Sequence, residues 1–192
     1  RMLSAQQVLD IEYALGPGVA GGLEVPEEGL VCPWTTMLAF ASQATVNGAQ
    51  FSFESRVTDV VRQRDLTWQL NIDGSEPVLA KYVVNAAGVH VDDINAMFGH
   101  GEFDIVARKG CFLTFDRVAR PLFSHIVMPV LGAVGRAHIA PTIHGALAIG
   151  PMLTDAADKD DSSVTPADLD ALLDFGDAVA PRLMRSEEHT SE

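Results

Sequence analysis

The chain has 192 residues, of which 47% are hydrophobic, and carries a formal net charge of −13. With 13 Lys and Arg against 26 Asp and Glu, it lacks the clustered cations that nucleic-acid binding requires. No apolar run approaches the roughly 20 residues that cross a bilayer, and no signal-peptide pattern opens the chain. We therefore expect a cytoplasmic protein that binds no nucleic acid and has no integral membrane segment. Peripheral membrane association of the full protein stays open.

The N-terminal region combines a helix signal with a glycine pattern that is easily misread. Ser4 and Gln7 form a capping-box pattern, which predicts a helix over residues 5–15. Gly16–Gly21 then match G-x-G-x-x-G, a pattern that holds a pyrophosphate only between a strand and a following helix N-terminus. Here a helix precedes the glycines and a strand near residues 22–25 is predicted to follow. We therefore expect Gly16–Gly21 to bind no pyrophosphate.

The next hundred residues predict one helix and a series of short strands. Pro33 starts a predicted helix that ends at Asn47-Gly48, and its apolar face is expected to be core. That face consists of Trp34, Met37, Leu38, Ala41 and Ala44. Strands are predicted at 23–25, 30–32, 50–54, 57–64, 67–72 and 77–85.

A strand, a small-residue turn and a helix follow one another around residues 82–98. The apolar run Tyr82–Val84 predicts a strand that is buried on both faces. Ala86, Ala87 and Gly88 carry no bulk, so a ligand can approach the backbone closely there. The helix predicted over 89–98 completes a corner that is typical of nucleotide-binding sheets. Tight packing of small residues is the alternative interpretation.

The remaining chain predicts an antiparallel layer, because no helix between its strands is long enough for a parallel crossover. Its strands are expected at 104–115, 124–129, 137–141 and 146–149. An acidic loop over 155–163 and a helix that begins after Thr165 follow. The two cysteines, Cys32 and Cys111, lie far apart and predict neither a disulfide nor a metal site.

Several short motifs occur in an order that a known family shares. They are Gly22–Gly29, Val83-Val-Asn-Ala-Ala-Gly88, Ala107–Gly110, Pro141-Thr142 and Ile149-Gly-Pro151. Over about residues 3–181 the chain resembles the D-amino-acid-oxidase-like FAD-dependent oxidoreductases. Within that family it is most similar to the glycerol-3-phosphate dehydrogenase large-subunit type, and next to L-2-hydroxyglutarate dehydrogenase.

The resemblance implies a mixed α/β (α+β) fold that binds FAD. Residues 1–100 would be a partial Rossmann-like FAD-binding domain with an inserted β-meander, whose N-terminal G-x-G-x-x-G element would lie upstream of Arg1. Residues 101–184 would be the antiparallel substrate layer and a helix, and we therefore expect a central fragment of an enzyme. Residues 185–192 look like a translated sequencing adapter. The cofactor-binding positions implied are Val57, Ala86, Ala87 and Gly88, with the Val57 backbone near the adenine; an ordinary core role for Val57 stays open.

Flavin oxidation of an alcohol or amine needs a proton acceptor and cations that hold an anionic substrate. His138 ranks first as the base, because imidazole titrates near neutrality and Arg136 would share its strand face. Arg108, beside Lys109, is the second candidate cation. The other candidate bases are His125 and His144, and a structural role is the alternative for each of these side chains.

The predicted function is that of an FAD-dependent oxidoreductase acting on a small anionic hydroxy compound. Glycerol 3-phosphate or a 2-hydroxy acid would transfer a hydride to the flavin N5 atom. The electron acceptor is left open, and the chain by itself is expected to be inactive. An amine or amino-acid oxidase of the same family is one alternative, and a non-catalytic binding module is another.

Overall fold

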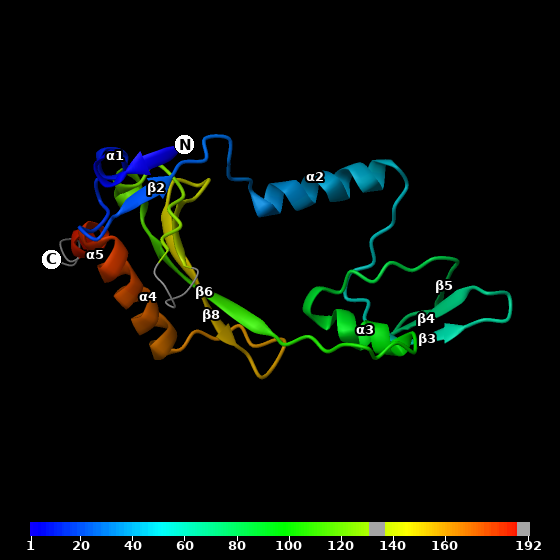
Figure 1. Cartoon of the computed structure of the whole chain (residues 1–192). Coiled ribbons are helices and arrows are strands. Elements are labelled where there is room, and N and C mark those ends of the chain that lie inside the picture. Colours follow the sequence, from blue (N-terminus) through cyan, green and yellow to red (C-terminus); the bar gives the residue numbers. More distant parts are fainter. Residues whose placement is uncertain (131–136, 188–192) are drawn as a thin grey trace. The chain divides into compact units, whose positions relative to one another are not determined.

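The computed structural model describes residues 1–130 and 137–187, and the chain divides into two compact units. Unit 1 comprises Arg1–Pro33, Arg108–Asp155 and the chain from Asp161 onwards. Unit 2 comprises Trp34–Ala107 and Ala156–Asp160. Figure 1 follows the elements of each unit along the chain, and the units are described separately below.

The N-terminal part of unit 1 is a pair of short antiparallel strands with a capped helix between them in the chain. Strand β1 (Met2–Ser4) pairs antiparallel with β2 (Gly21–Leu23), and α1 (Ala5–Ile11) lies between them in the chain. The predicted capping box is confirmed, because Ser4 and Gln7 exchange hydrogen bonds between side chain and backbone. A strand follows the glycines, as predicted, so no helix N-terminus faces a ligand there. The strand predicted at 30–32 is wrong, since those residues have no regular structure.

The main sheet of unit 1 has the strand order β6-β8-β7 and is antiparallel throughout, which confirms the predicted antiparallel layer. Its strands are β6 (Arg108–Phe115), β7 (His138–Pro141) and β8 (Leu147–Asp155). The segment 124–129 forms only an isolated bridge, between Val127 and Ile139, and not the full strand predicted. The register of β6 and β8 shifts between Cys111 and Leu113.

Two helices close the core of unit 1, and the first of them covers one face of the sheet (Figure 1). They are α4 (Pro166–Val179), which begins with the predicted capping pattern at Thr165 and Asp168, and α5 (Pro181–Glu187). A short 3-10 helix, η2 (Arg117–Leu122), follows β6. The largest fully buried side chains all belong to this core: Phe123, Ile139, Leu147, Ile149, Leu172 and Leu183.

Helix α2 (Pro33–Val46) forms where the sequence predicts it, but its predicted role in a core is wrong. None of its residues is buried, and Trp34, Met37 and Leu38 are 67%, 56% and 66% exposed. The apolar face exists in the sequence, but no element among the described residues packs over it.

Unit 2 is built around a three-stranded meander, as predicted. Its strands β3 (Val57–Arg62), β4 (Trp68–Ile72) and β5 (Val78–Ala80) pair antiparallel in chain order. The Arg62 guanidinium lies 4.3 Å from the Trp68 ring centroid, which is cation–π distance. The strand predicted at 50–54 is wrong, because that segment has no regular structure.

The predicted buried strand at Tyr82–Val84 is also wrong. β5 ends at Ala80, and residues 82–87 have no regular secondary structure. Tyr82 and Val84 are 90% and 88% exposed. The helix after the small-residue turn does form, as η1 (Gly88–His90) and α3 (Val91–Met97).

Candidate functional site

An apolar pocket of about 190 Å³ lies in unit 2, beside the small-residue turn. Val57, Ala86 and Ala87 all line it, so three of the four predicted cofactor-binding residues lie together. The rest of the lining is Val60, Leu70, Val83, Val84, Asn85, Ile94 and Phe98. Pockets that enclose a whole ligand measure about 300 to 1,000 Å³, so this one is sized for a single ring system.

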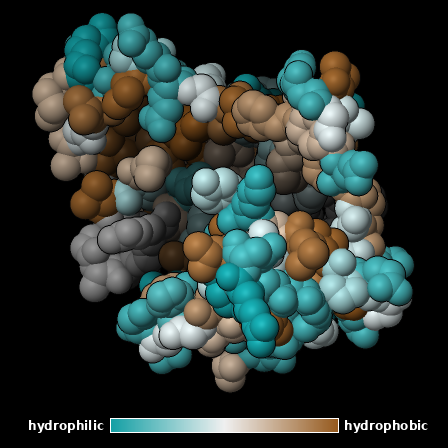
Figure 2. Space-filling view, turned by 90° about the vertical axis from the view of Figure 1, so that its right-hand side faces the viewer, coloured by the Kyte–Doolittle hydropathy of each residue, from teal (hydrophilic) through white to brown (hydrophobic). Residues whose placement is uncertain are grey.

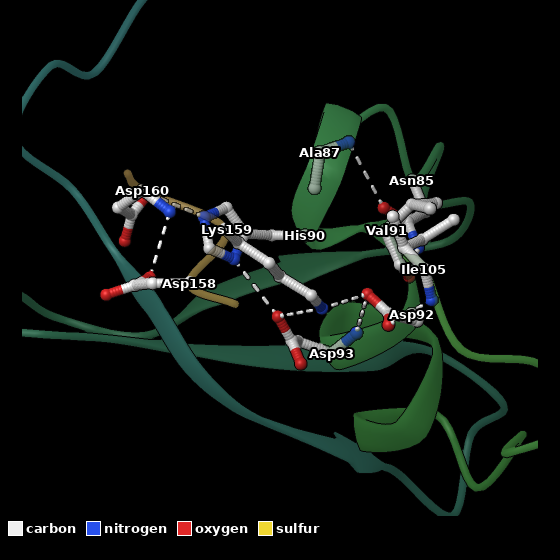
Figure 3. A network of polar contacts seen from close by, with 10 residues as sticks. All are labelled: Asn85, Ala87, His90, Val91, Asp92, Asp93, Ile105, Asp158, Lys159 and Asp160. Atoms are coloured by element: carbon white, nitrogen blue, oxygen red, sulfur yellow. Dashed lines mark hydrogen bonds and ion pairs between the residues drawn. The ribbon is translucent and has the colours of Figure 1, made fainter. Parts of the chain in front are cut away.

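The fourth predicted residue, Gly88, does not line the pocket but has the backbone that the turn needs. Its φ is +58°, a region that favours glycine, and a Cβ built there would meet no atom within 4 Å. Asn85 fixes the turn, because its side chain accepts a hydrogen bond from the Ala87 amide and donates one to the Val91 carbonyl (2.8 Å). The two hydrogen bonds of Asn85, drawn in Figure 3, therefore hold the turn, and the space next to Gly88 is free of other atoms.

A charged network ties the segment 156–160 to the start of α3 within unit 2 (Figure 3). Asp92 is 9% exposed and accepts hydrogen bonds from the Ile105 amide (2.8 Å) and from the Lys159 ammonium. These bonds, the amide first, lower the pKa of Asp92 to about 2. Lys159 also contacts Asp93 at 2.9 Å, and both carboxylates raise the pKa of its ammonium, Asp92 the more.

His90 completes this network with a carboxylate on each ring nitrogen. Nδ1 lies 3.0 Å from Asp93 and Nε2 lies 3.0 Å from Asp160. Only the doubly protonated imidazole can donate to both, and hydrogen bonds to Asp160 and then Asp93 raise the pKa of His90. The sequence showed 155–163 only as an acidic loop, so this network was not predicted.

The turn and the pocket beside it form an apolar and accessible surface. The apolar lining suits a flat ring, and the small side chains of Ala86 and Ala87 leave the backbone accessible. Val57, Ala86 and Ala87, three of the residues for which contacts with FAD are predicted, line this pocket, and Gly88 follows them in the turn. When bound, FAD supplies the hydride acceptor that no amino-acid side chain provides.

The second candidate region is the face of the β6-β8-β7 sheet opposite the core. Side chains alternate along a strand, so His138 and Ala140 lie on the other face from the buried Ile139. The register places Gly150 opposite His138 and Ala148 opposite Ala140. This face therefore presents the His138 imidazole beside two alanines and a glycine, with the centroid of the Phe112 ring 6.5 Å from that of the imidazole.

The two predicted cations that the structure describes are engaged by carboxylates. Arg108 Nε donates to Asp155 at 2.7 Å, in a pair whose side chains are 59% and 65% exposed. Lys109 is 13% exposed and donates to the Asp161 carboxylate (3.2 Å) and to the Ser163 carbonyl (2.9 Å). Lys109 is thus a structural cation, whereas the exposed Arg108 pair is weak and exchangeable. Arg136, the first-ranked cation, lies outside the described residues.

The other two candidate bases are not on the open face near His138. His125 Nδ1 lies 2.6 Å from Glu12, a side chain only 4% exposed that also accepts from the amides of Ser124 and His125. That arrangement links the end of α1 to the segment after η2, and sequence reasoning missed Glu12 entirely. His144 is exposed in the turn between β7 and β8.

Two further findings limit the chemistry of the described part of the chain. No group of three or more His, Cys, Asp or Glu side chains there is arranged to hold a metal ion. No helix within residues 1–130 and 137–187 is both long enough and apolar enough to span a bilayer.

Comparison with known proteins identifies the class. The family described as FAD dependent oxidoreductase (DAO) matches residues 1–191. A glycerol 3-phosphate dehydrogenase of Caloramator mitchellensis is 28% identical over 174 residues, 90% of this chain and 36% of that protein. The chain therefore belongs to the FAD-dependent oxidoreductase family, which confirms the resemblance read from its motifs.

Solved structures agree with this assignment at the level of the fold. The L-alpha-glycerophosphate oxidase of Mycoplasma pneumoniae, solved with FAD bound, superposes with a TM-score of 0.84 at 23% identity. It is matched over 94% of this chain and 48% of its own. The L-proline dehydrogenase of P. horikoshii also gives a TM-score of 0.84, at 20% identity over 96% of this chain and 49% of its own. This chain thus spans less than half the length of each of these three proteins.

Proposed function

We propose that the complete protein is an FAD-dependent oxidoreductase that oxidises a small anionic hydroxy compound, either glycerol 3-phosphate or a 2-hydroxy acid. The family supports the use of FAD. The observation that carries the choice of substrate is the 28% identity, over 90% of this chain, to a protein named glycerol 3-phosphate dehydrogenase. The fold alone does not discriminate, because an L-proline dehydrogenase shares it equally well.

In this proposal the open sheet face of unit 1 receives the substrate. The His138 imidazole accepts the hydroxyl proton when the substrate is oxidised, since a neutral imidazole nitrogen can act as a general base. Ala140 and Ala148 are the small residues near it, and the Phe112 ring lies over Gly150. Arg108 binds the anionic group by exchanging its exposed contact with Asp155, a type of pair worth about 0 to 1 kcal/mol. Arg136 is the second proposed cation.

In unit 2 the proposed role of Val57, Ala86, Ala87 and Gly88 is to hold part of FAD. Val57 and the two alanines offer an apolar surface to a ring, and Gly88 keeps the turn open. The oxidised flavin would accept the hydride, and what then reoxidises it is left to experiment.

The test is steady-state kinetics of the complete FAD-loaded protein with glycerol 3-phosphate, 2-hydroxyglutarate and a D-amino acid. We expect turnover of a hydroxy compound, and we expect His138→Gln to lower kcat about 10²-fold with unchanged flavin content. His144→Gln is the matched control, because His144 lies in an exposed turn, and it should behave as the wild type. Turnover of the amino acid alone would replace the proposal with an amine oxidase. Wild-type kinetics in His138→Gln would remove His138 from the mechanism.

A further inference from the structure

The open face of the β6-β8-β7 sheet has an irregularity where it carries His138. Cys111 pairs with Met152 and Leu113 pairs with Ile149, so the single residue Phe112 on β6 faces two residues on β8. The extra residue makes this a β-bulge, and bulges re-aim side chains. The two opposing residues are Gly150 and Pro151, neither of which continues an ordinary strand.

Gly150 is the residue that lets Phe112 reach across the sheet. Its φ is +140°, and a Cβ built there would lie 2.7 Å from the Phe112 ring and 2.7 Å from the Cys111 carbonyl oxygen. The Phe112 ring therefore covers the bare backbone of β8. Any side chain at position 150 would displace it.

Across Gly150, the Phe112 ring meets the imidazole of His138. His138 on β7 pairs with Gly150 on β8. The centroids of the Phe112 and His138 rings are 6.5 Å apart, and the ring planes make an angle of 75°. This edge-to-face geometry is favourable for aromatic pairs. Phe112 is 54% exposed, so one side of its ring contacts the sheet and the other side is accessible.

We propose that Phe112 is a positioning residue for His138 and limits the size of the substrate. The inference rests on the proposed function, since it concerns the same open face. The ring fixes the orientation of the imidazole by contact, and its exposed part fills the space next to it. A small hydroxy compound fits beside His138, whereas a 2-hydroxy acid with a bulky substituent meets the phenyl ring.

The experiment compares Phe112→Ala, Phe112→Leu and Phe112→Tyr in the complete FAD-loaded protein. The substrates are glycerol 3-phosphate and mandelate, a 2-hydroxy acid with an aromatic substituent. We expect Phe112→Ala to lower kcat for glycerol 3-phosphate by about tenfold, because a loosened base is misplaced. We also expect it to raise kcat/KM for mandelate relative to glycerol 3-phosphate by at least about tenfold, the effect of a few methylene volumes in a pocket.

The other variants separate positioning from folding. Phe112→Tyr keeps the ring and should retain the wild-type kcat and preference. Phe112→Leu keeps apolar volume but not the ring, so its kcat should fall while its kcat/KM for mandelate changes little. If Phe112→Ala does not bind FAD, Phe112→Leu takes its place in the test of positioning. Phe103→Ala is the matched control, because Phe103 is 46% exposed and lies in unit 2.

The outcomes distinguish the two proposals. A wild-type protein that oxidises neither glycerol 3-phosphate nor any 2-hydroxy acid would overturn the proposed function. A wild-type protein that oxidises glycerol 3-phosphate, with Phe112→Ala and Phe112→Leu as active and as selective as Phe103→Ala, would overturn only the role of Phe112.

Discussion

The two units of the chain differ in how far their large apolar side chains are buried. In unit 1 the sheet and the helices α4 and α5 enclose a core in which Phe123, Ile139 and Leu172 are at most 1% exposed. In unit 2 Val60 and Ala107 are the only described hydrophobic residues below 9% exposure, and large side chains such as Phe40 (73%) and Phe53 (83%) are accessible. Figure 2 shows such apolar residues on the surface among polar ones.

This difference shows that an amphipathic sequence pattern predicts a helix but does not predict whether its apolar face is buried. Helices α2 and α4 have the same length, and both follow from their sequence patterns. Helix α4 has a sheet face to cover, whereas no described element covers α2. An apolar helix face is buried only where another element packs against it, and only then does it stabilise the fold.

A matched pair of leucine substitutions tests this contrast most strongly. Leu172 in α4 is 1% exposed and Leu38 in α2 is 66% exposed. We expect Leu172→Ala to lower the free energy of unfolding by about 2 to 5 kcal/mol, through lost burial and a cavity. Leu38→Ala should change it by no more than about 0.5 kcal/mol. The measurement is denaturant unfolding of the 192-residue chain, and equal losses in both variants would show that α2 is packed after all.

A second contrast concerns two particular carboxylates, one embedded in unit 1 and one at the surface of unit 2. Glu12 is 3% exposed and accepts hydrogen bonds from two amides and an imidazole, whereas Glu102 pairs with His100 at the surface. Glu12→Ala should cost about 1 to 3 kcal/mol, because the donors lose their acceptor. Glu102→Ala should leave thermal unfolding unchanged, since exposed pairs contribute little.

The control for this pair is Glu12→Gln, which keeps an oxygen acceptor and should lose less than Glu12→Ala. If Glu12→Ala unfolds at the wild-type temperature, water replaces the carboxylate without loss. The link between α1 and the segment after η2 would then contribute nothing to stability.

Much of the fold follows from local sequence signals. The capping residues Ser4 and Thr165, the meander strands and the antiparallel sheet all form as predicted, because caps, turns and alternation act over a few residues. Tyr82–Val84 shows the limit of such signals. β-branched residues indicate a strand, but a strand also needs a neighbour, and the sequence pattern does not say whether one is present.

The candidate site was predictable in part for the same reason. The small side chains of Ala86–Gly88 and a resemblance of motifs predict a cofactor contact there, and the resemblance alone predicts one at Val57. The structure places Val57, Ala86 and Ala87 around one pocket. Phe112 and Glu12 were not predicted. The contacts of Phe112 depend on the register of the sheet. The partners of Glu12 lie more than 100 residues away in the chain. Neither kind of contact produces a local sequence pattern.

The smallest expected effect concerns the charged network of unit 2 around His90 and Lys159. His90 contacts Asp160 and Asp93, and its pKa is raised from the 6.5 of a free imidazole, chiefly by Asp160. A raised pKa means that protonation favours the folded contacts. The stabilisation is therefore fully present below about pH 6.5 and is lost as pH rises through the higher folded pKa. Lys159 keeps its charge throughout, because its own pKa is raised.

Hydrogen exchange of the 156–160 amides measures this loss directly. After correction for intrinsic exchange, protection in the wild type should be constant below about pH 6.5 and should fall as the pH rises through the higher pKa of the folded His90. His90→Gln should show weaker protection that does not change with pH, since glutamine does not titrate. His100→Gln, which alters an exposed pair elsewhere in unit 2, should retain the wild-type pH dependence. The same pH dependence in His90→Gln would contradict the prediction, because a group other than His90 would then be titrating with the loss of protection.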